Sequence, residues 1–300
     1  MTTNLTQPNS TANFQAIKGE SLLHKARKRF MRHRLAMFGL VALMLMLATA
    51  VFAPFIERYP PNDLNLEAMG QAPSAAHWLG TDTTGRDVWS RVVHASQVSM
   101  SVGLVAVSIS TFIGVLIGSI SGYASGKVDL LLMRVTDMVM AFPSMVIIIT
   151  VASVLGPSIY NTMLVIGVLT WPGVARLVRG QMLSFREQQF VLAARSIGAT
   201  PWQIMYRHLF PNVVGTVTVA ATFGMANAIL QEAALSFLGL GVQAPTPSWG
   251  NMLRDAQTLS ILEGMPWLWL VPGLMIALAV LSINFIGDGL RDALDPRSVL

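Results

Sequence analysis

The sequence contains no cysteine and few charged residues. Without cysteine the chain can form no disulfide, thiolate metal site, iron–sulfur cluster or lipid-modified thiol. Charged residues make up only 12% of its 300 residues, whereas soluble proteins contain roughly 25%. Hydrophobic residues make up 53%, and the mean hydropathy is +0.57. These values indicate a membrane protein.

Motifs for nucleotides, metals and catalysis are also missing. The stretch "SGYASGKV" at 121–128 differs from a phosphate-binding loop, because Ser121 replaces its first glycine and Val128 its Mg²⁺-binding Ser or Thr. The stretch "GLGVQA" at 239–244 has no strand–helix–strand pattern around it. There is no HExxH motif, and the 20 Lys and Arg residues do not gather in a soluble module. The sequence therefore predicts no enzyme, no cofactor or metal held by this chain, and no nucleic-acid partner.

Six apolar stretches are long enough to cross a lipid bilayer, which takes about 20 residues per helix. The first is too long for the hydrophobic core of a signal peptide, so we expect an uncleaved span. Gly156-Pro157-Ser158 divides the long run 138–175 into two spans. The predicted spans are 35–56, 98–123, 138–155, 159–178, 213–235 and 265–287. We expect an all-α membrane protein with six transmembrane helices within residues 35–290.

The positions of Lys and Arg predict the orientation in the membrane. Sixteen of these residues lie on the side of the N-terminal leader and four on the opposite side. Lys and Arg are enriched in cytoplasmic loops. We therefore expect both termini in the cytoplasm. The predicted parts are a basic cytoplasmic leader 1–34, an external segment 57–97, a cytoplasmic loop 179–212 and a cytoplasmic tail 291–300.

Three glycines in the second span share one helix face. Gly114, Gly118 and Gly122 repeat every fourth residue. Small residues at this spacing let two helices approach closely within a membrane. We interpret the three glycines as a helix-packing face.

The cytoplasmic loop has the pattern of a helical hairpin. Ser184 with Glu187, and Thr200 with Gln203, have the spacing of a capping box. Gly198 stands where a helix end favours a positive φ angle. The pattern predicts a helix over 185–197, a turn at 198–199, and a second helix over 201–210 that ends at Pro211.

Each predicted helix of the hairpin has an apolar face. The faces comprise Phe190, Ala193, Ala194 and Ile197 in the first helix, and Trp202, Met205 and Leu209 in the second. These faces lie outside the bilayer and are too small to form a domain. They need either another protein or the ends of this chain's own helices to cover them.

The hairpin resembles the EAA loop of binding-protein-dependent ABC importer permeases. The resemblance rests on Ala193-Ala194, Gly198 and Pro211. Three positions depart from the motif, because Leu192 replaces its Glu, His208 an aliphatic residue and Phe210 a Leu. The variant "RHLFPN" is similar to the form in the dipeptide/oligopeptide subfamily. Three further stretches resemble the second, C-type permease of that subfamily: "LGTDTTGRDVWSR" (79–91), "EAALSFLGLGVQAPTPSWGNML" (232–253) and "NFIGDGLRDALDP" (284–296).

The resemblance implies a type I ABC importer permease fold and a transport subunit of the bacterial inner membrane. It implies four kinds of partner: a homologous permease in a heterodimer, two cytoplasmic ATPase subunits that bind ATP and Mg²⁺, an extracytoplasmic peptide-binding protein, and the lipid bilayer. The loop would carry a coupling helix that lodges in a groove of the ATPase. The residues expected to couple to the ATPase are Ala193, Ala194, Gly198, Trp202, Arg207 and Pro211.

Glu232 is the clearest ionisable residue at membrane depth. It could hydrogen-bond near the outer interface to the partner permease, or line the translocation path or gate with Ser236. A proton-coupled secondary transporter is the main alternative to an ABC permease, but it would need several such groups. Within the ABC class the substrate stays open, because relatives of this subfamily carry dipeptides, oligopeptides, glutathione, nickel chelates or opines.

Overall fold

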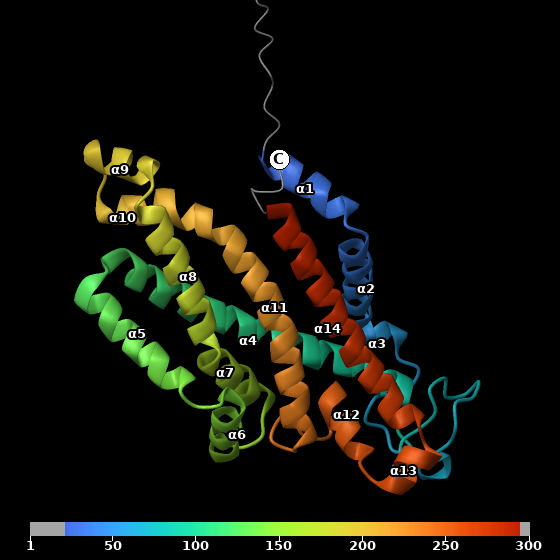
Figure 1. Cartoon of the computed structure of the whole chain (residues 1–300). Coiled ribbons are helices and arrows are strands. Elements are labelled where there is room, and N and C mark those ends of the chain that lie inside the picture. The colour runs from blue at the N-terminus through green and yellow to red at the C-terminus, as the bar shows by residue number, and fades with distance from the viewer. Residues whose placement is uncertain (1–21, 295–300) are drawn as a thin grey trace, which may run out of the picture.

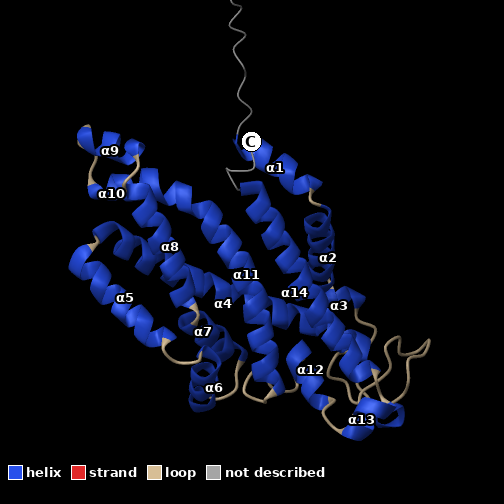
Figure 2. Cartoon of the chain, viewed as in Figure 1, coloured by secondary structure: helices blue, strands red, loops and turns tan. Residues whose placement is uncertain are grey.

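The computed structural model describes residues 22–294, and these residues form helices and loops without a strand (Figures 1 and 2). The predicted leader 1–34 and tail 291–300 therefore lie partly outside the described residues. The elements are α1 Leu22–Arg32, α2 Arg34–Val51, α3 Ala53–Ile56, the 3₁₀ turn η1 Leu66–Ala68, α4 Val88–Ala124, α5 Gly126–Met140, α6 Ser144–Leu155, α7 Ile159–Leu169, α8 Trp171–Arg186, α9 Gln189–Ser196, α10 Pro201–Gln203, the π-helical turn η2 Ile204–Leu209, α11 Phe210–Phe237, α12 Trp249–Asp255, α13 Leu259–Gly264 and α14 Trp267–Leu294.

Long helices run between the two ends of the molecule, and the short helices and loops lie at these ends (Figure 1). One end holds α1, α9, α10 and the C-terminal end of α14. The opposite end holds α12, α13 and the loops between α3 and α4. The long helix α4 contacts α2, α7, α8 and α11, and α14 contacts both α2 and α11. The hairpin is therefore on the same end as the two termini of the described chain.

Within residues 22–294, five helical stretches are long and apolar enough to span a membrane. They are Arg34–Val51, Val88–Ala124, Ile159–Arg186, Pro201–Phe237 and Trp267–Leu294. The pair α5 and α6 gives a sixth candidate span, although the two helices meet at an angle of 79°. The helices agree with the predicted six spans in number and order when this bent pair is counted as one.

The region of the predicted third span has a different shape from the expected one. Residues 127–137, which lie between the predicted second and third spans, belong to helix α5, and the chain bends before Pro143. Proline has no N–H to donate and disfavours helical geometry at the residue before it, so α5 ends at Met140 and α6 starts after Pro143. The predicted span 138–155 is therefore not one continuous helix: its helical part from residue 144 onward is α6, and residues 138–140 belong to the end of α5.

Three groups of buried apolar side chains hold the helices together. The first lies where α4, α11, α12 and α14 meet and includes Trp249, which is fully buried. The second joins α4, α6, α7 and α11 around Ile148 and Ile166. The third joins α8 to the hairpin and includes Val178 and Met182. This third group attaches the hairpin to a spanning helix.

Candidate functional site

The turn of the hairpin follows the sequence pattern closely. Gly198 has a φ angle of +84°, a conformation that favours glycine. Thr200 caps the next helix, because its Oγ1 accepts a hydrogen bond from Gln203 N at 3.3 Å while Thr200 N donates to Gln203 Oε1 at 2.8 Å. Pro201 occupies the first helical position, where its missing N–H costs little. The turn at 198–199 and the second capping box are confirmed.

Two other details of the predicted hairpin were wrong. Ser184 lies inside α8, and Glu187 follows the end of that helix rather than starting a new one. The second helix does not end at Pro211, because it continues through η2 into α11. In the π-helical turn η2 the backbone hydrogen bonds join residues five apart instead of the four of an α-helix. Pro211 lies in the first turn of α11, which follows η2. Proline lacks the backbone N–H donor, and in the first turn of an α-helix that N–H would have no intrahelical acceptor, so Pro211 is tolerated there.

The inner side of the hairpin packs against the rest of this chain. Val191, Ile204 and Leu209 are at most 1% exposed, and Ala194 is 5% exposed. Val191, Ile204 and Leu209 belong to the third buried group, together with Val178 and Met182 of α8. Of the two expected ways to cover the hairpin, its inner side follows the second: it packs against a helix of its own chain.

The outer side of the hairpin exposes large apolar side chains. Ile197 is 87% exposed, Trp202 68% and Tyr206 65%. The rings of Trp202 and Tyr206 are stacked, with centroids 6.4 Å apart. Of the residues expected to couple to an ATPase, Ala194 is buried, and the exposed ones are Ala193, Gly198, Trp202, Arg207 and Pro211. We call the side formed by Ile197, Trp202 and Tyr206 the outer hairpin face.

The three glycines of α4 lie directly against α8, the helix that leads into the hairpin. A Cβ atom on Gly114 would be 2.6 Å from Val174 Cβ, and one on Gly118 would be 2.5 Å from the Ala175 carbonyl oxygen. A Cβ on Gly122 would be 2.6 Å from Met182 Cβ. Real Cβ atoms do not come this close, so the glycines permit the close packing of the two helices.

Polar contacts join α8 to α5 as well. Arg179 donates two hydrogen bonds to the carboxylate of Asp129, at 2.5 and 2.7 Å. Ser121 of α4 donates to the same carboxylate. Arg176 is 2.5 Å from Asp137. A bidentate pair between arginine and a carboxylate fixes the relative orientation of two side chains. Helices α4, α5 and α8 are therefore held together next to the hairpin.

Glu232 lies at the centre of a buried network at the opposite end of α11. Its side chain is fully buried, and its two oxygens accept hydrogen bonds from Ser99 at 2.9 Å and Ser236 at 2.8 Å. The Ser99 hydroxyl in turn accepts from Trp249 N at 3.2 Å, and the Ser236 hydroxyl accepts from Val242 N at 3.0 Å. The partners of Glu232 are thus residues of its own chain, and the network joins α4, α11, α12 and the loop before α12.

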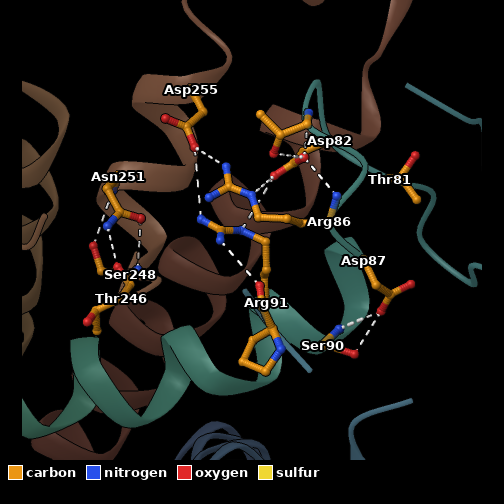
Figure 3. Close-up of polar contacts among 12 residues, drawn as sticks. Thr81, Asp82, Arg86, Asp87, Ser90, Arg91, Thr246, Ser248, Asn251 and Asp255 are labelled. Atoms are coloured by element: carbon orange, nitrogen blue, oxygen red, sulfur yellow. Dashed lines mark hydrogen bonds and ion pairs between the residues drawn. The ribbon is translucent and has the colours of Figure 1, made fainter. Parts of the chain in front are cut away.

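A cluster of four charged residues fixes the segment before α4 to α12 (Figure 3). Arg86 donates to Asp82 at 2.6 Å and lies 3.4 Å from Asp255. Arg91, whose side chain is 3% exposed, lies 3.8 Å from Asp82 and 3.9 Å from Asp255. We call Asp82, Arg86, Arg91 and Asp255 the charge cluster. It ties together residues far apart in the sequence.

The two carboxylates of the charge cluster have opposite pKa shifts. Burial alone would raise the pKa of Asp82, but hydrogen bonds from Thr84 and Arg86 and the charge of Arg86 outweigh burial and lower it. Burial raises the pKa of Asp255, and the charges of Arg91 and Arg86 only partly oppose this effect. Because the Asp255 side chain is 46% exposed, water moderates the rise.

Neither network follows from the sequence pattern. The stretch 79–91 resembles a permease segment, but its spacing assigns no role to Asp82, Arg86 or Arg91. Asp255 lies 169 residues from Arg86, and Ser99 lies 133 residues from Glu232. No local spacing could have paired them.

Residues 114–299 match the family model described as "Binding-protein-dependent transport system inner membrane component". The chain belongs to this family. Residues 21–73 of the permease also match the model of the N-terminal TM domain of oligopeptide transport permease C. The family has the type I ABC permease fold, so the expected all-α transmembrane fold is confirmed. Its members are multi-pass inner-membrane transport subunits rather than enzymes, and they bind no cofactor themselves.

Curated relatives resemble the permease over nearly the whole chain. A Brucella suis protein named as a peptide permease is 46% identical over 276 residues, which are 92% of this chain and 91% of the relative. The dipeptide transport system permease protein DppC of Alkalihalophilus pseudofirmus is 40% identical over 97% of this chain and 95% of its own. The glutathione transport system permease protein GsiD of Escherichia coli is 41% identical over 91% and 90%. Permeases of this family work with a partner permease, ATPases and a binding protein.

Proposed function

We propose that this permease is one of two homologous transmembrane subunits of an ATP-driven importer for dipeptides or oligopeptides. The names of two of its relatives refer to peptides or dipeptides. In this proposal the chain pairs with its homologue to form the translocation path, and an extracytoplasmic binding protein delivers the peptide. Two cytoplasmic ATPase subunits bind ATP and Mg²⁺ and drive the cycle.

The outer hairpin face is the observation that carries this proposal. It presents Ile197, Trp202 and Tyr206 to solvent on a hairpin that the third buried group attaches to α8. Exposed contiguous apolar groups mark protein interaction sites. The ATPase covers this face, and Ala193, Gly198, Arg207 and Pro211 border the contact. Ala194 supports it from the inner side.

The hairpin and both ends of the described chain are cytoplasmic in this proposal. Their common position at one end of the structure (Figure 1) and the enrichment of Lys and Arg there support this orientation. Labelling of single cysteines, introduced into the cysteine-free chain, tests it. Position 70 should react only from outside and position 188 only from the cytoplasm, and the reverse pattern would contradict the orientation.

Glu232 and Ser236 have a gating role in this proposal without lining the path. They hold the loop before α12 and the start of α12 against α4, at the end of the molecule away from the hairpin. Movement of α11 during the cycle would pull this loop along with it.

A peptide-like molecule such as glutathione is the second candidate substrate, because one relative is named for glutathione transport. A nickel chelate stays a further alternative from the sequence resemblance. A proton-coupled carrier would need a chain of titratable groups through the membrane. Glu232 is instead surrounded by serine hydroxyls in the described structure.

The test is transport by the complete system in proteoliposomes, with the partner permease, ATPases and binding protein. Uptake of dipeptide that requires ATP, and co-purification of this chain with an ATPase, are the expected results. Uptake by this chain alone under a pH gradient would overturn the proposal. Competition by glutathione or nickel chelates against labelled dipeptide then separates the substrates.

A further inference from the structure

A cavity of about 170 Å³ lies within the spanning helices, between α4, the junction of α7 with α8, and α11. Four polar side chains line it: Ser110, Thr170, Asn227 and Gln231. The other lining residues are apolar or glycine, and none of the described lining residues is charged. The sequence interpretation gave none of these four residues a role. Glu232 and Ser236 are not among the lining residues.

The hydrogen bonds around this cavity leave acceptor oxygens unused. The Ser110 hydroxyl donates its proton to the Val107 carbonyl at 3.1 Å, and Thr170 donates to the Ile166 carbonyl at 2.7 Å. A hydroxyl has one proton but two acceptor positions, so both oxygens still have acceptor capacity. The Ser110 and Thr170 hydroxyls therefore donate to the backbone and can only accept hydrogen bonds from a molecule in the cavity.

Two amides on one face of α11 complete the lining. Asn227 and Gln231 are four residues apart on the helix, and Asn227 donates one N–H to the Phe223 carbonyl at 3.1 Å. The side-chain oxygen of Gln231 is buried and has no hydrogen-bond partner in the described structure. This oxygen has almost no accessible surface in the described structure, so the Gln231 side-chain amide must turn before a donor in the cavity can reach it. A buried acceptor without a partner costs free energy, which favours that turn when a donor is present.

We propose that this cavity is a subsite of the translocation path that binds N–H donors of a passing peptide, with Gln231 Oε1 as the main acceptor and Ser110, Thr170 and Asn227 beside it. The donor is a backbone amide or the amino terminus. This inference rests on the proposed function. An uncharged lining recognises what all peptides share and is indifferent to the charge of their side chains, which suits a path for varied sequences.

The test uses the complete transport system and Gln231→Met, which keeps the length of the side chain but removes the oxygen acceptor. We expect peptide uptake to fall about threefold to tenfold, the effect of one neutral hydrogen bond. Binding-protein-stimulated ATP hydrolysis should persist. Gln231→Glu retains the acceptor and should keep peptide uptake closer to wild type than Gln231→Met does.

A threonine pair provides a matched control. Thr170→Val should lower uptake, whereas Thr150→Val should not. Thr150 donates to its own helix at 2.8 Å as Thr170 does, but it lies on α6 and does not line the cavity. Equal effects of the two changes would show that lost helix hydrogen bonds, rather than the cavity, explain the result.

Modified peptides identify the donor. For each peptide the ratio of Gln231→Met uptake to wild-type uptake is measured, so that the preference of the binding protein cancels. If the ratio returns to one for an N-acetylated peptide, the donor is the amino terminus; if it returns to one for a peptide methylated at an internal amide, the donor is the backbone. Wild-type uptake by Gln231→Met for all peptides would mean that the cavity holds only water, and would overturn the inference. Absence of peptide uptake by the wild-type system would instead overturn the proposed function.

Discussion

Replacing Gly198 with valine should disconnect the hairpin from the ATPase without damaging the membrane domain. A Cβ atom at Gly198 would meet no heavy atom within 4 Å, so steric crowding adds nothing. The cost comes from the backbone, because φ is +84° and a β-branched residue at positive φ is strained by about 1–3 kcal/mol. If the turn relaxes to relieve this strain, the outer hairpin face moves, and affinity for the ATPase falls on the order of 10- to 100-fold.

The control for this prediction is Gly180→Val in α8. Gly180 also has open space around its Cβ position, but it lies inside a helix with an ordinary φ angle. Valine is a better helix former than glycine, so this variant should behave like wild type. The assays are co-purification with the partner permease and stimulation of ATP hydrolysis by the peptide-loaded binding protein. Full stimulation in Gly198→Val would refute the reasoning, as would an equal loss in both variants.

Three further changes test the packing and the networks. Glu232→Gln should change the free energy of unfolding little, because its amide can still hydrogen-bond to both serines. Glu232→Leu leaves the buried serine hydroxyls without this partner and should lower the free energy of unfolding by about 1–3 kcal/mol. Equal melting temperatures of the two variants would contradict the network. Gly118→Ala should lower the free energy of unfolding by about 1–3 kcal/mol, because its Cβ would meet the α8 backbone. Gly173→Ala has open space around its Cβ and should leave stability unchanged or raise it. The reverse order would contradict the packing. Asp82→Asn should destabilise more than Asp255→Asn at neutral pH, since folding lowers the pKa of Asp82 and raises that of Asp255. The Asp82 contribution is present above its ordinary pKa of 3.8 and disappears as the pH falls through the lowered value, so a wild-type melting curve without acid destabilisation in that range would argue against it.

Sequence patterns predicted features that depend on neighbouring residues. The positive φ of Gly198 and the Thr200–Gln203 capping box are local, and both are present. Long charge-free runs gave the positions of the apolar helices, because a membrane selects composition over about 20 residues. The break at Gly156 was also visible, since glycine followed by proline ends a helix.

Features that depend on distant contacts or on unusual helix geometry were missed. Pro211 was interpreted as a helix end, because the sequence does not show that η2 shifts the hydrogen-bonding pattern before it. The bend before Pro143 was missed because the run 138–155 contains no charged residue, although the proline itself is the signal for a break. The cavity beside Gln231 brings together α4, α7, α8 and α11, and its unpaired acceptor exists only after these helices pack.

We propose above all that the outer hairpin face contacts an ATPase subunit. A single cysteine at position 202 in the cysteine-free chain, treated with a short crosslinker in the assembled complex, tests it most directly. Trp202 is 68% exposed on this face, whereas the control position Phe112 is 72% exposed on spanning helix α4. We expect position 202 to crosslink to the ATPase and position 112 not to. Crosslinks from position 202 only within its own chain, or equally from both positions, would contradict the account.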